Sequence, residues 1–150
     1  MKHILLTIAL LFPMAANSYM LLPIVEVMDG DTIRTDMSTR LPDPLGKVKI
    51  RIRGIDTPEM PAKSYATTGK LNKAKCVKEA ELALEAKAYL EGIAIGFKRM
   101  KVDNFIWGTY GGRIVADVRI GGVDIGPALL DAGYAVPYDG KAAKSQDWCQ

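Results

Sequence analysis

Histidine is nearly absent from this sequence, and its absence narrows the chemistry that the chain can perform. The single histidine is His3, within an N-terminal segment that does not resemble part of a folded domain. Without imidazole, Ser-His-Asp hydrolysis, histidine general bases and most zinc sites are excluded. Proton transfer near neutral pH must then be carried out by a carboxylate, a lysine, a tyrosine or water activated by a metal ion.

The N-terminal segment contains a markedly apolar run, Ile4–Phe12, which is shorter than the roughly 20 residues that a membrane span needs. Lys2 precedes the run and small residues follow it, an order typical of a secretory signal. We therefore expect residues 1–18 to be a signal peptide, cleaved after Ala16 or Ser18. An uncleaved membrane anchor or a buried N-terminal strand would be the alternative.

The remaining residues, 19–150, have the composition of one soluble domain. The whole chain is 49% hydrophobic and 25% charged, which is enough for a real core, and it shows no repeat or low-complexity tract. Its net charge of +3 is compatible with a polyanionic partner but does not establish one. We expect an exported monomer, periplasmic or secreted, with no stable membrane association after removal of the signal.

Cysteine is scarce as well, with only Cys76 and Cys149. They are too far apart to form a paired-cysteine zinc motif, and no histidine can complete one. An even count in an exported chain favours a disulfide, which would contribute about 4 kcal/mol by closing a long loop. Two unpaired thiols, one of them on a loose tail, are the alternative.

The pattern of apolar residues predicts a mainly β protein with helices (α+β). The expected strands and helices, in chain order, are strands 24–28, 32–35 and 47–55, helix 76–91 ending at Gly92, strands 97–105 and 112–120, and a short helix within 123–135 with Asp124 as its N-cap. Five short strands with one helix between the third and the fourth suggest a Greek-key barrel of the oligonucleotide/oligosaccharide-binding type, with a second helix at the C-terminus.

Carboxylates gather in two short stretches, "DGDT" at 29–32 and "DTPE" at 56–59. The first is by itself an ordinary hairpin turn, and its register is wrong for the motif of aspartyl phosphatases. In a three-strand meander, however, the turn after the first strand lies near the end of the third. Asp31 and Asp56 would then converge on one cation, and an all-oxygen site of this kind suits calcium.

Basic residues lie close to these carboxylates. Arg51 precedes Asp56 on the strand "KVKIRIRGI", and Arg113 begins another strand; guanidinium groups match phosphate oxygens two at a time. Most of the other bases on this strand are expected to form an ordinary solvated face. Arg51 and Asp56 have opposite parity, so we predict that Gly54 marks a kink or bulge that brings Asp56 to the face of Arg51.

Three motifs in this order and spacing, "DGDT", "RIRGIDTPE" and "YGGRIVADV", resemble those of the thermonuclease (staphylococcal nuclease-like) family. The two cysteines and the C-terminal "DWC" are similar to exported bacterial members. The resemblance implies a calcium-dependent endonuclease that hydrolyses DNA or RNA with little sequence specificity. Some domains of this type bind nucleic acid without cutting it, and that is the alternative function.

The resemblance also implies roles for individual residues. Asp31 and Asp56 would bind calcium through carboxylates and Thr57 through its carbonyl, with Asp29 behind them. Arg51 and Arg113 would bind the phosphate, and Glu59 would act as the general base or orient the attacking water.

Two features depart from the family's best-known member: an extra glycine precedes Arg113, and Thr109 stands where a basic residue is common. The tyrosines that stack on the nucleotide base have no secure match. The candidates for further contacts with nucleic acid are Lys63, Lys70 and the tyrosines Tyr110, Tyr134 and Tyr138, each of which could equally belong to the core or the rim.

Overall fold

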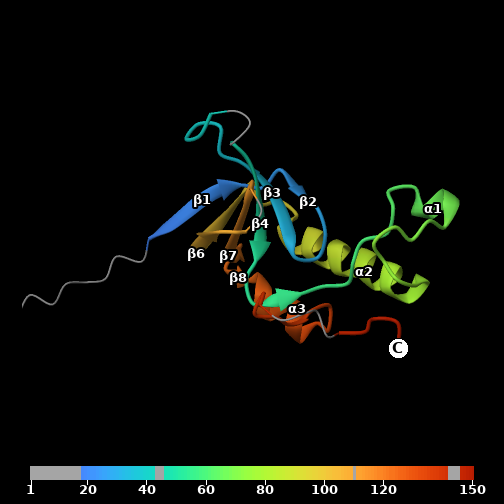
Figure 1. Ribbon diagram of the computed structural model, residues 1–150. Helices are drawn as coiled ribbons and strands as arrows, with labels where there is room; N and C mark the ends of the chain where they lie inside the picture. Colours follow the sequence, from blue (N-terminus) through green and yellow to red (C-terminus); the bar gives the residue numbers. More distant parts are fainter. Residues whose placement is uncertain (1–17, 43–45, 110, 142–145) are drawn as a thin grey trace, which may run out of the picture.

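The computed structural model describes residues 18–42, 46–109, 111–141 and 146–150, and its centre is one mixed β-sheet (Figure 1). The predicted signal peptide and Tyr110 lie outside the described residues, apart from residue 18. Six strands of the sheet hydrogen-bond in the order β1-β6-β7-β4-β3-β2, and β8 pairs with β7. The strands are β1 (Tyr19–Pro23), β2 (Glu26–Val27), β3 (Thr32–Asp36), β4 (Lys47–Ile52), β6 (Arg99–Trp107), β7 (Arg113–Ile120) and β8 (Val123–Asp124).

The two ends of this strand order, β1 and β2, are consecutive in the chain and separated only by Ile24 and Val25. Ile24 N–H donates to the carbonyl of Lys98 and Val25 N–H to that of Arg34, both at 3.0 Å. β1 and β2 therefore act as one bent strand that joins both edges of the sheet. Counted in this way, five main strands form an arrangement like the predicted barrel, although the hydrogen-bonded sheet is not closed.

The alternation of β4 decides which face of the sheet is buried. Val48, Ile50 and Ile52 are buried, whereas Lys47 and Lys49 are exposed. Because side chains alternate along a strand, this pattern holds the apolar row against the core and the basic row against solvent. β7 alternates in the same way and runs parallel to β4, whereas the other pairs are antiparallel.

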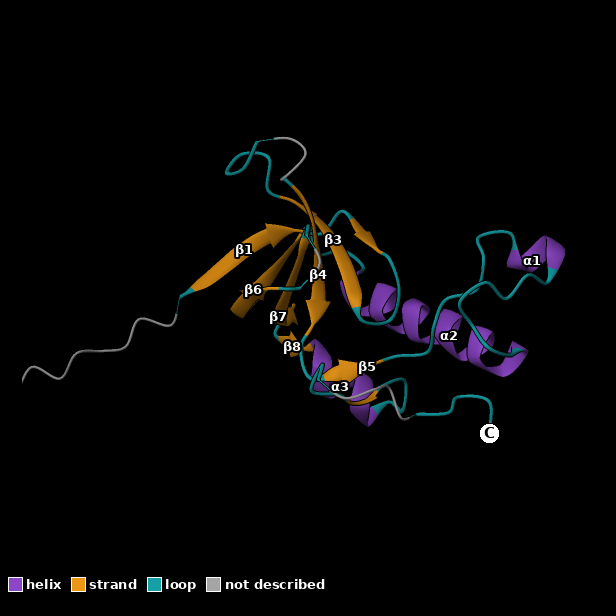
Figure 2. Ribbon diagram, in the orientation of Figure 1, coloured by secondary structure: helices purple, strands orange, loops and turns teal. Residues whose placement is uncertain are grey.

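Three helices and a small second sheet complete the described fold (Figure 2). They are α1 (Tyr65–Thr68), α2 (Val77–Ala94) and α3 (Ile125–Asp131), and β5 (Ile55–Asp56) paired with β9 (Val136–Pro137). The predicted helix between the third and fourth main strands is α2, and the predicted C-terminal helix is α3. None of the described helices has the length and apolar character that crossing a membrane requires.

Several predicted boundaries were wrong for reasons of tertiary packing. α2 continues past Gly92 to Ala94 because Ile93 and Ala94 pack against the core, and this burial outweighs the low helix propensity of glycine. Asp124 precedes α3, but its carboxylate makes no cap hydrogen bond and instead accepts from Arg119, with Nε–Oδ1 at 2.8 Å. The predicted strand 24–28 is replaced by β1 and β2, which meet at a corner.

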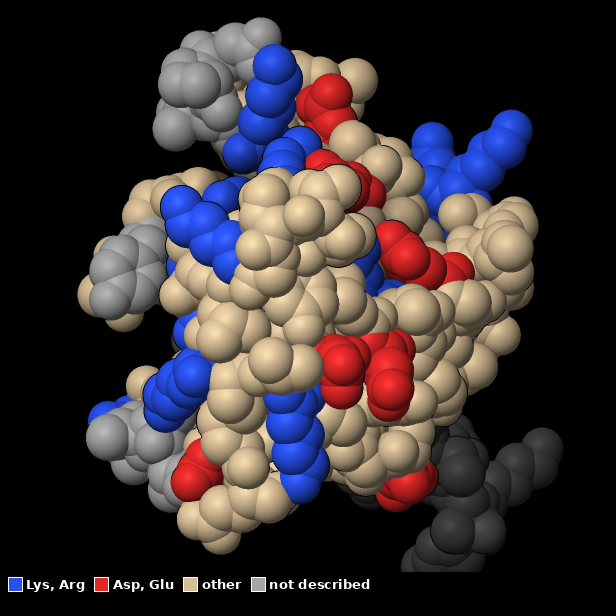
Figure 3. Space-filling view, turned by 90° about the vertical axis from the view of Figure 1, so that its right-hand side faces the viewer, with Lys and Arg blue, Asp and Glu red and all other residues tan. Residues whose placement is uncertain are grey.

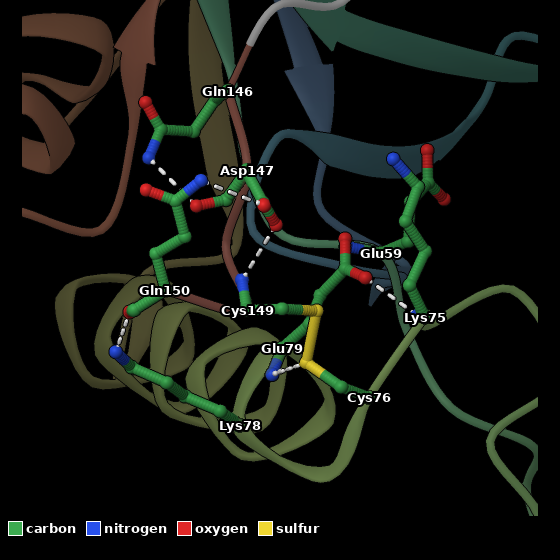
Figure 4. Close-up of a disulfide and its surroundings, with 9 residues drawn as sticks. All are labelled: Glu59, Lys75, Cys76, Lys78, Glu79, Gln146, Asp147, Cys149 and Gln150. Atoms are coloured by element: carbon green, nitrogen blue, oxygen red, sulfur yellow. Dashed lines mark hydrogen bonds between the residues drawn. A yellow bond between two sulfur atoms is a disulfide. The ribbon is translucent and has the colours of Figure 1, made fainter.

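The predicted disulfide is present, between Cys76 and Cys149. Cys76 is also the N-cap of α2, since its sulfur accepts a hydrogen bond from the backbone N–H of Glu79 at 3.4 Å. The bond therefore ties the start of α2 to the C-terminal end of the chain, as Figure 4 shows.

Candidate active site

Arg51 on β4 connects the two aspartates that the sequence singled out. Its Nη1 lies 2.7 Å from Oδ1 of Asp31, and its Nη2 lies 2.8 Å from Oδ1 of Asp56. Both carboxylates are almost fully buried, at 2% and 3% exposure, while the Arg51 side chain is 18% exposed. Buried charges need such pairing because water no longer stabilises them. One guanidinium thus holds two carboxylates in one cluster, one from the turn before β3 and one from β5.

The predicted break at Gly54 is confirmed. β4 ends at Ile52, Gly54 has φ of +80°, and the chain resumes as β5 at Ile55. This φ lies in the left-handed region that glycine adopts readily. Asp56 is thereby turned toward the guanidinium of Arg51 instead of pointing to the opposite face.

The turn that carries Asp29 and Asp31 is held close to α2. The Asp31 N–H donates to Oδ1 of Asp29 at 3.1 Å. Gly30 is not among the described glycines with positive φ, so its backbone is not the reason for glycine here. A Cβ at Gly30 would instead lie 2.9 Å from Cβ of Ala86 and 3.0 Å from Cγ2 of Thr57. Glycine is needed because α2 and the Thr57 loop approach so closely.

We expect Gly30→Ala to lower the free energy of unfolding by about 1–3 kcal/mol, the usual cost of overpacking, and to displace Asp31 from Arg51. Urea denaturation followed by circular dichroism measures the change. Gly92→Ala is the matched control, because a Cβ there meets no atom within 4 Å and alanine favours a helix. A Gly30→Ala protein as stable as the parent would contradict the close contact.

A small polar pocket of about 60 Å³ opens beside this cluster. The residues that line it are Asp29, Asp31, Arg51, Thr57, Pro58, Glu59, Met60 and Lys73. It therefore collects three carboxylates and two cationic side chains in a space large enough for an ion and a water molecule. Glu59 lines the pocket, whereas Asp56 does not and is in contact with Arg51.

A larger hollow of about 300 Å³ lies elsewhere and does not suit the same chemistry. Its lining is apolar apart from Arg40, and includes Met20, Phe105 and Trp107. It offers no carboxylate or amide oxygen to a cation and at most one guanidinium to an anion. The smaller polar pocket is therefore the candidate active site.

The oxygen atoms in and beside the pocket belong to the classes of ligand that calcium prefers. Burial of the Asp31 carboxylate raises its pKa to about 7, although the neighbouring Arg51 acts in the opposite direction. A divalent cation beside Asp31 would lower this pKa, because a nearby positive charge favours the ionised form. Among the described residues, no three His, Cys, Asp or Glu side chains are grouped as a metal site by themselves. Of the ligands expected from the sequence, Asp31 and Thr57 line the pocket and would hold the ion with water and substrate oxygens, whereas Asp56 does not line it.

Arg113 lies on the same face of the sheet as Arg51. It is the neighbour of Lys49, which precedes Arg51 by two positions on β4. In the register of the sheet it is paired with Lys49, which is paired in turn with Arg34 on β3. Residues paired across strands point to the same face, so Arg34, Lys49 and Arg113 form a transverse cationic row beside Arg51, in which Arg34 is also ion-paired with Glu26 at 2.7 Å. Arg113 does not line the pocket itself. Figure 3 shows lysine and arginine side chains gathered along the left-hand edge of that view.

The remaining predicted residues are more scattered. Lys63 and Lys70 are exposed near α1 and do not line the pocket. The Tyr138 N–H donates to the carbonyl of Gly54 at 2.9 Å, which places its backbone next to the turn that positions Asp56. Lys73 lines the pocket but was not singled out, since the lysine-rich segment offers no pattern that distinguishes it.

Comparison with known families agrees with this arrangement. A family model described as staphylococcal nuclease homologue matches residues 49–148, which include Arg51, Asp56, Glu59 and Arg113. The match covers about two thirds of the chain and spans β4 to the C-terminal segment. A comparison with curated proteins gave no match. The chain therefore belongs to the family of staphylococcal nuclease homologues.

Proposed function

We propose that this protein is a calcium-dependent endonuclease that hydrolyses phosphodiester bonds of DNA or RNA with little sequence specificity. The observation that carries the proposal is the convergence of Asp31, Arg51 and Glu59 on one polar pocket. Membership of a nuclease family and the cationic row beside the pocket support it. A polyanionic substrate would meet positive charge on approach and carboxylates at the reacting position.

Each residue then has a physical task. Phosphodiesters resist attack because their negative charge repels nucleophiles, so charge neutralisation is the main requirement. Arg51 has five N–H donors in a planar fork, and its exposed edge would bind phosphate oxygens. Arg113 would stabilise charge that develops on the phosphate. Calcium, when bound, would supply a divalent positive charge at the same position.

Glu59 would accept a proton from the attacking water, or orient that water in line with the leaving oxygen. It lies on the wall of the same pocket as Asp31 and Arg51. Of the described residues that line this pocket, none is aromatic, so the pocket itself has no platform for stacking on a base.

The experiment is to incubate the purified protein with labelled single-stranded DNA and RNA in calcium, and again in excess chelator. We expect cleavage in calcium and at least a hundredfold slower cleavage in chelator. Asp31→Asn should raise the calcium concentration needed for half-maximal activity, whereas Glu85→Gln, an exposed change on α2, should not. Binding of the strands without cleavage would overturn the proposal in favour of a binding module, and equal rates in chelator would exclude calcium dependence.

Export is a further part of the proposal. The disulfide between Cys76 and Cys149 supports it, because such bonds persist in oxidising compartments such as the periplasm or the cell exterior. The signal peptide, the absence of a stable membrane association and the monomeric state stay predictions.

A further inference from the structure

Glu79 is a buried carboxylate that the chemistry described so far does not use. It is the third residue of α2 and only 3% exposed. Charged side chains at this depth are rare unless they are paired or hydrogen-bonded. A carboxylate buried to this extent is expected to have specific hydrogen-bond partners.

Both carboxylate oxygens of Glu79 accept backbone N–H groups from segments outside the helix. Oε1 accepts from the N–H of Glu59 at 3.3 Å, and Oε2 accepts from the N–H of Lys75 at 2.6 Å. Figure 4 shows Glu79 between the Lys75 segment and the disulfide, with Glu59 beside it. The bond to Lys75 is local and resembles ordinary capping of a helix start. The bond to Glu59 spans 20 residues and reaches the pocket loop.

A carboxylate suits this position better than other side chains. It offers two acceptor oxygens and no donor, which matches two converging N–H groups, and the N-terminus of a helix favours negative charge. Glutamine has only one oxygen, so it would satisfy one N–H and oppose the other with its own N–H₂. The two converging N–H groups therefore favour glutamate over glutamine at position 79.

The start of α2 is itself firmly anchored. The N–H of Glu79 donates to the sulfur of Cys76, which is bonded to Cys149. Further along, Ala86 of the same helix contacts the Gly30 turn. One helix thus contacts two of the segments that line the pocket: the turn that carries Asp31 and the loop that carries Glu59.

We propose that Glu79 is a positioning residue for Glu59. By holding the Glu59 backbone against the fixed start of α2, it keeps the Glu59 carboxylate directed into the pocket with Asp31 and Arg51. This inference rests on the proposed nuclease function for its kinetic consequence. Its structural consequence, an ordered Glu59 N–H, does not depend on that function.

The test compares Glu79→Gln with the matched control Glu81→Gln, which makes the same change at an exposed position of α2. We expect Glu79→Gln to lower kcat by about ten- to a hundredfold with KM changed less than about threefold, because small misplacements of a reacting group are costly. Amide hydrogen exchange of Glu59, followed by NMR, should become at least tenfold faster. Glu81→Gln should leave all three quantities unchanged.

The outcomes separate the two proposals. If the unaltered protein cleaves no nucleic acid, the nuclease proposal fails, and the exchange rate of the Glu59 amide still tests the contact. If the unaltered protein is active and Glu79→Gln keeps full kcat well below its melting temperature, Glu79 is only structural and the positioning role is wrong. Should Glu79→Gln fold poorly, Glu79→Asp, which keeps both oxygens on a shorter side chain, should retain more kcat than Glu79→Ala. Equal activity of those two variants would also contradict the proposal.

Discussion

Glu59→Gln is expected to lower kcat for strand cleavage by about 10²- to 10⁴-fold, the usual contribution of a positioned general base. The amide has the same shape as the carboxylate but cannot accept a proton from water. The backbone N–H of Glu59 that donates to Glu79 is unchanged, so the loop should keep its place. Initial rates on a labelled single strand at saturating calcium measure the effect.

The free energy of unfolding of Glu59→Gln should stay within about 0.5 kcal/mol of the parent value, as for most changes outside the core. Glu85→Gln is the control for a lost negative charge, because Glu85 is exposed on α2. A Glu59→Gln protein with parental kcat would show that Glu59 neither takes a proton nor orients water. An equal loss in the Glu85 variant would point to a general effect of charge.

Loss of the disulfide is expected to have the largest effect on stability. The Cys76–Cys149 bond joins residues separated by 73 positions, and closing a loop of that length contributes about 4 kcal/mol in the chain-entropy model. Domains of this kind are stable by only about 5–15 kcal/mol. The double variant Cys76→Ser/Cys149→Ser should therefore lose a large part of its free energy of unfolding, measured by urea denaturation.

Serine is chosen because it is a good N-cap residue and can still accept the N–H of Glu79. The decrease in the free energy of unfolding then measures the contribution of the covalent bond and not that of the helix cap. The parent protein under reducing conditions should give a similar value. Equal stability of the oxidised parent and the double variant would mean that the unfolded chain is not constrained by this bond.

The sequence predicted those parts of the molecule that depend on local pattern. The buried face of β4 could be predicted because Val48, Ile50 and Ile52 occupy alternate positions. The break at Gly54 was predicted because Arg51 and Asp56 would otherwise point to opposite faces. The bridge between Cys76 and Cys149 followed from their number. The helix between the third and fourth main strands followed from one helical segment with three extended segments before it and two after it.

What could not be predicted depends on contacts between distant segments. β1 is a strand because it pairs with β6 about 80 residues later. The residues of Tyr19–Pro23 show no local pattern from which this pairing could be predicted. Glu79 resembles any charged residue in a first helical turn until its burial is known. Gly30 was expected to serve the turn geometry, whereas the structure shows that it makes room for Ala86 and Thr57.

The corner between β1 and β2 also affects how two copies of the molecule can meet. Exposed strand edges are templates for intermolecular strand addition and aggregation. Here one edge strand turns at Ile24 and Val25 into the other, and the hydroxyl of Thr35 on β3 donates to the carbonyl of Pro23 at 2.7 Å. The edge strand β1 therefore uses part of its hydrogen-bonding capacity on β3, the strand next to the opposite edge. The proposed export would require the chain to refold, and this corner would then limit self-association of the refolding chain.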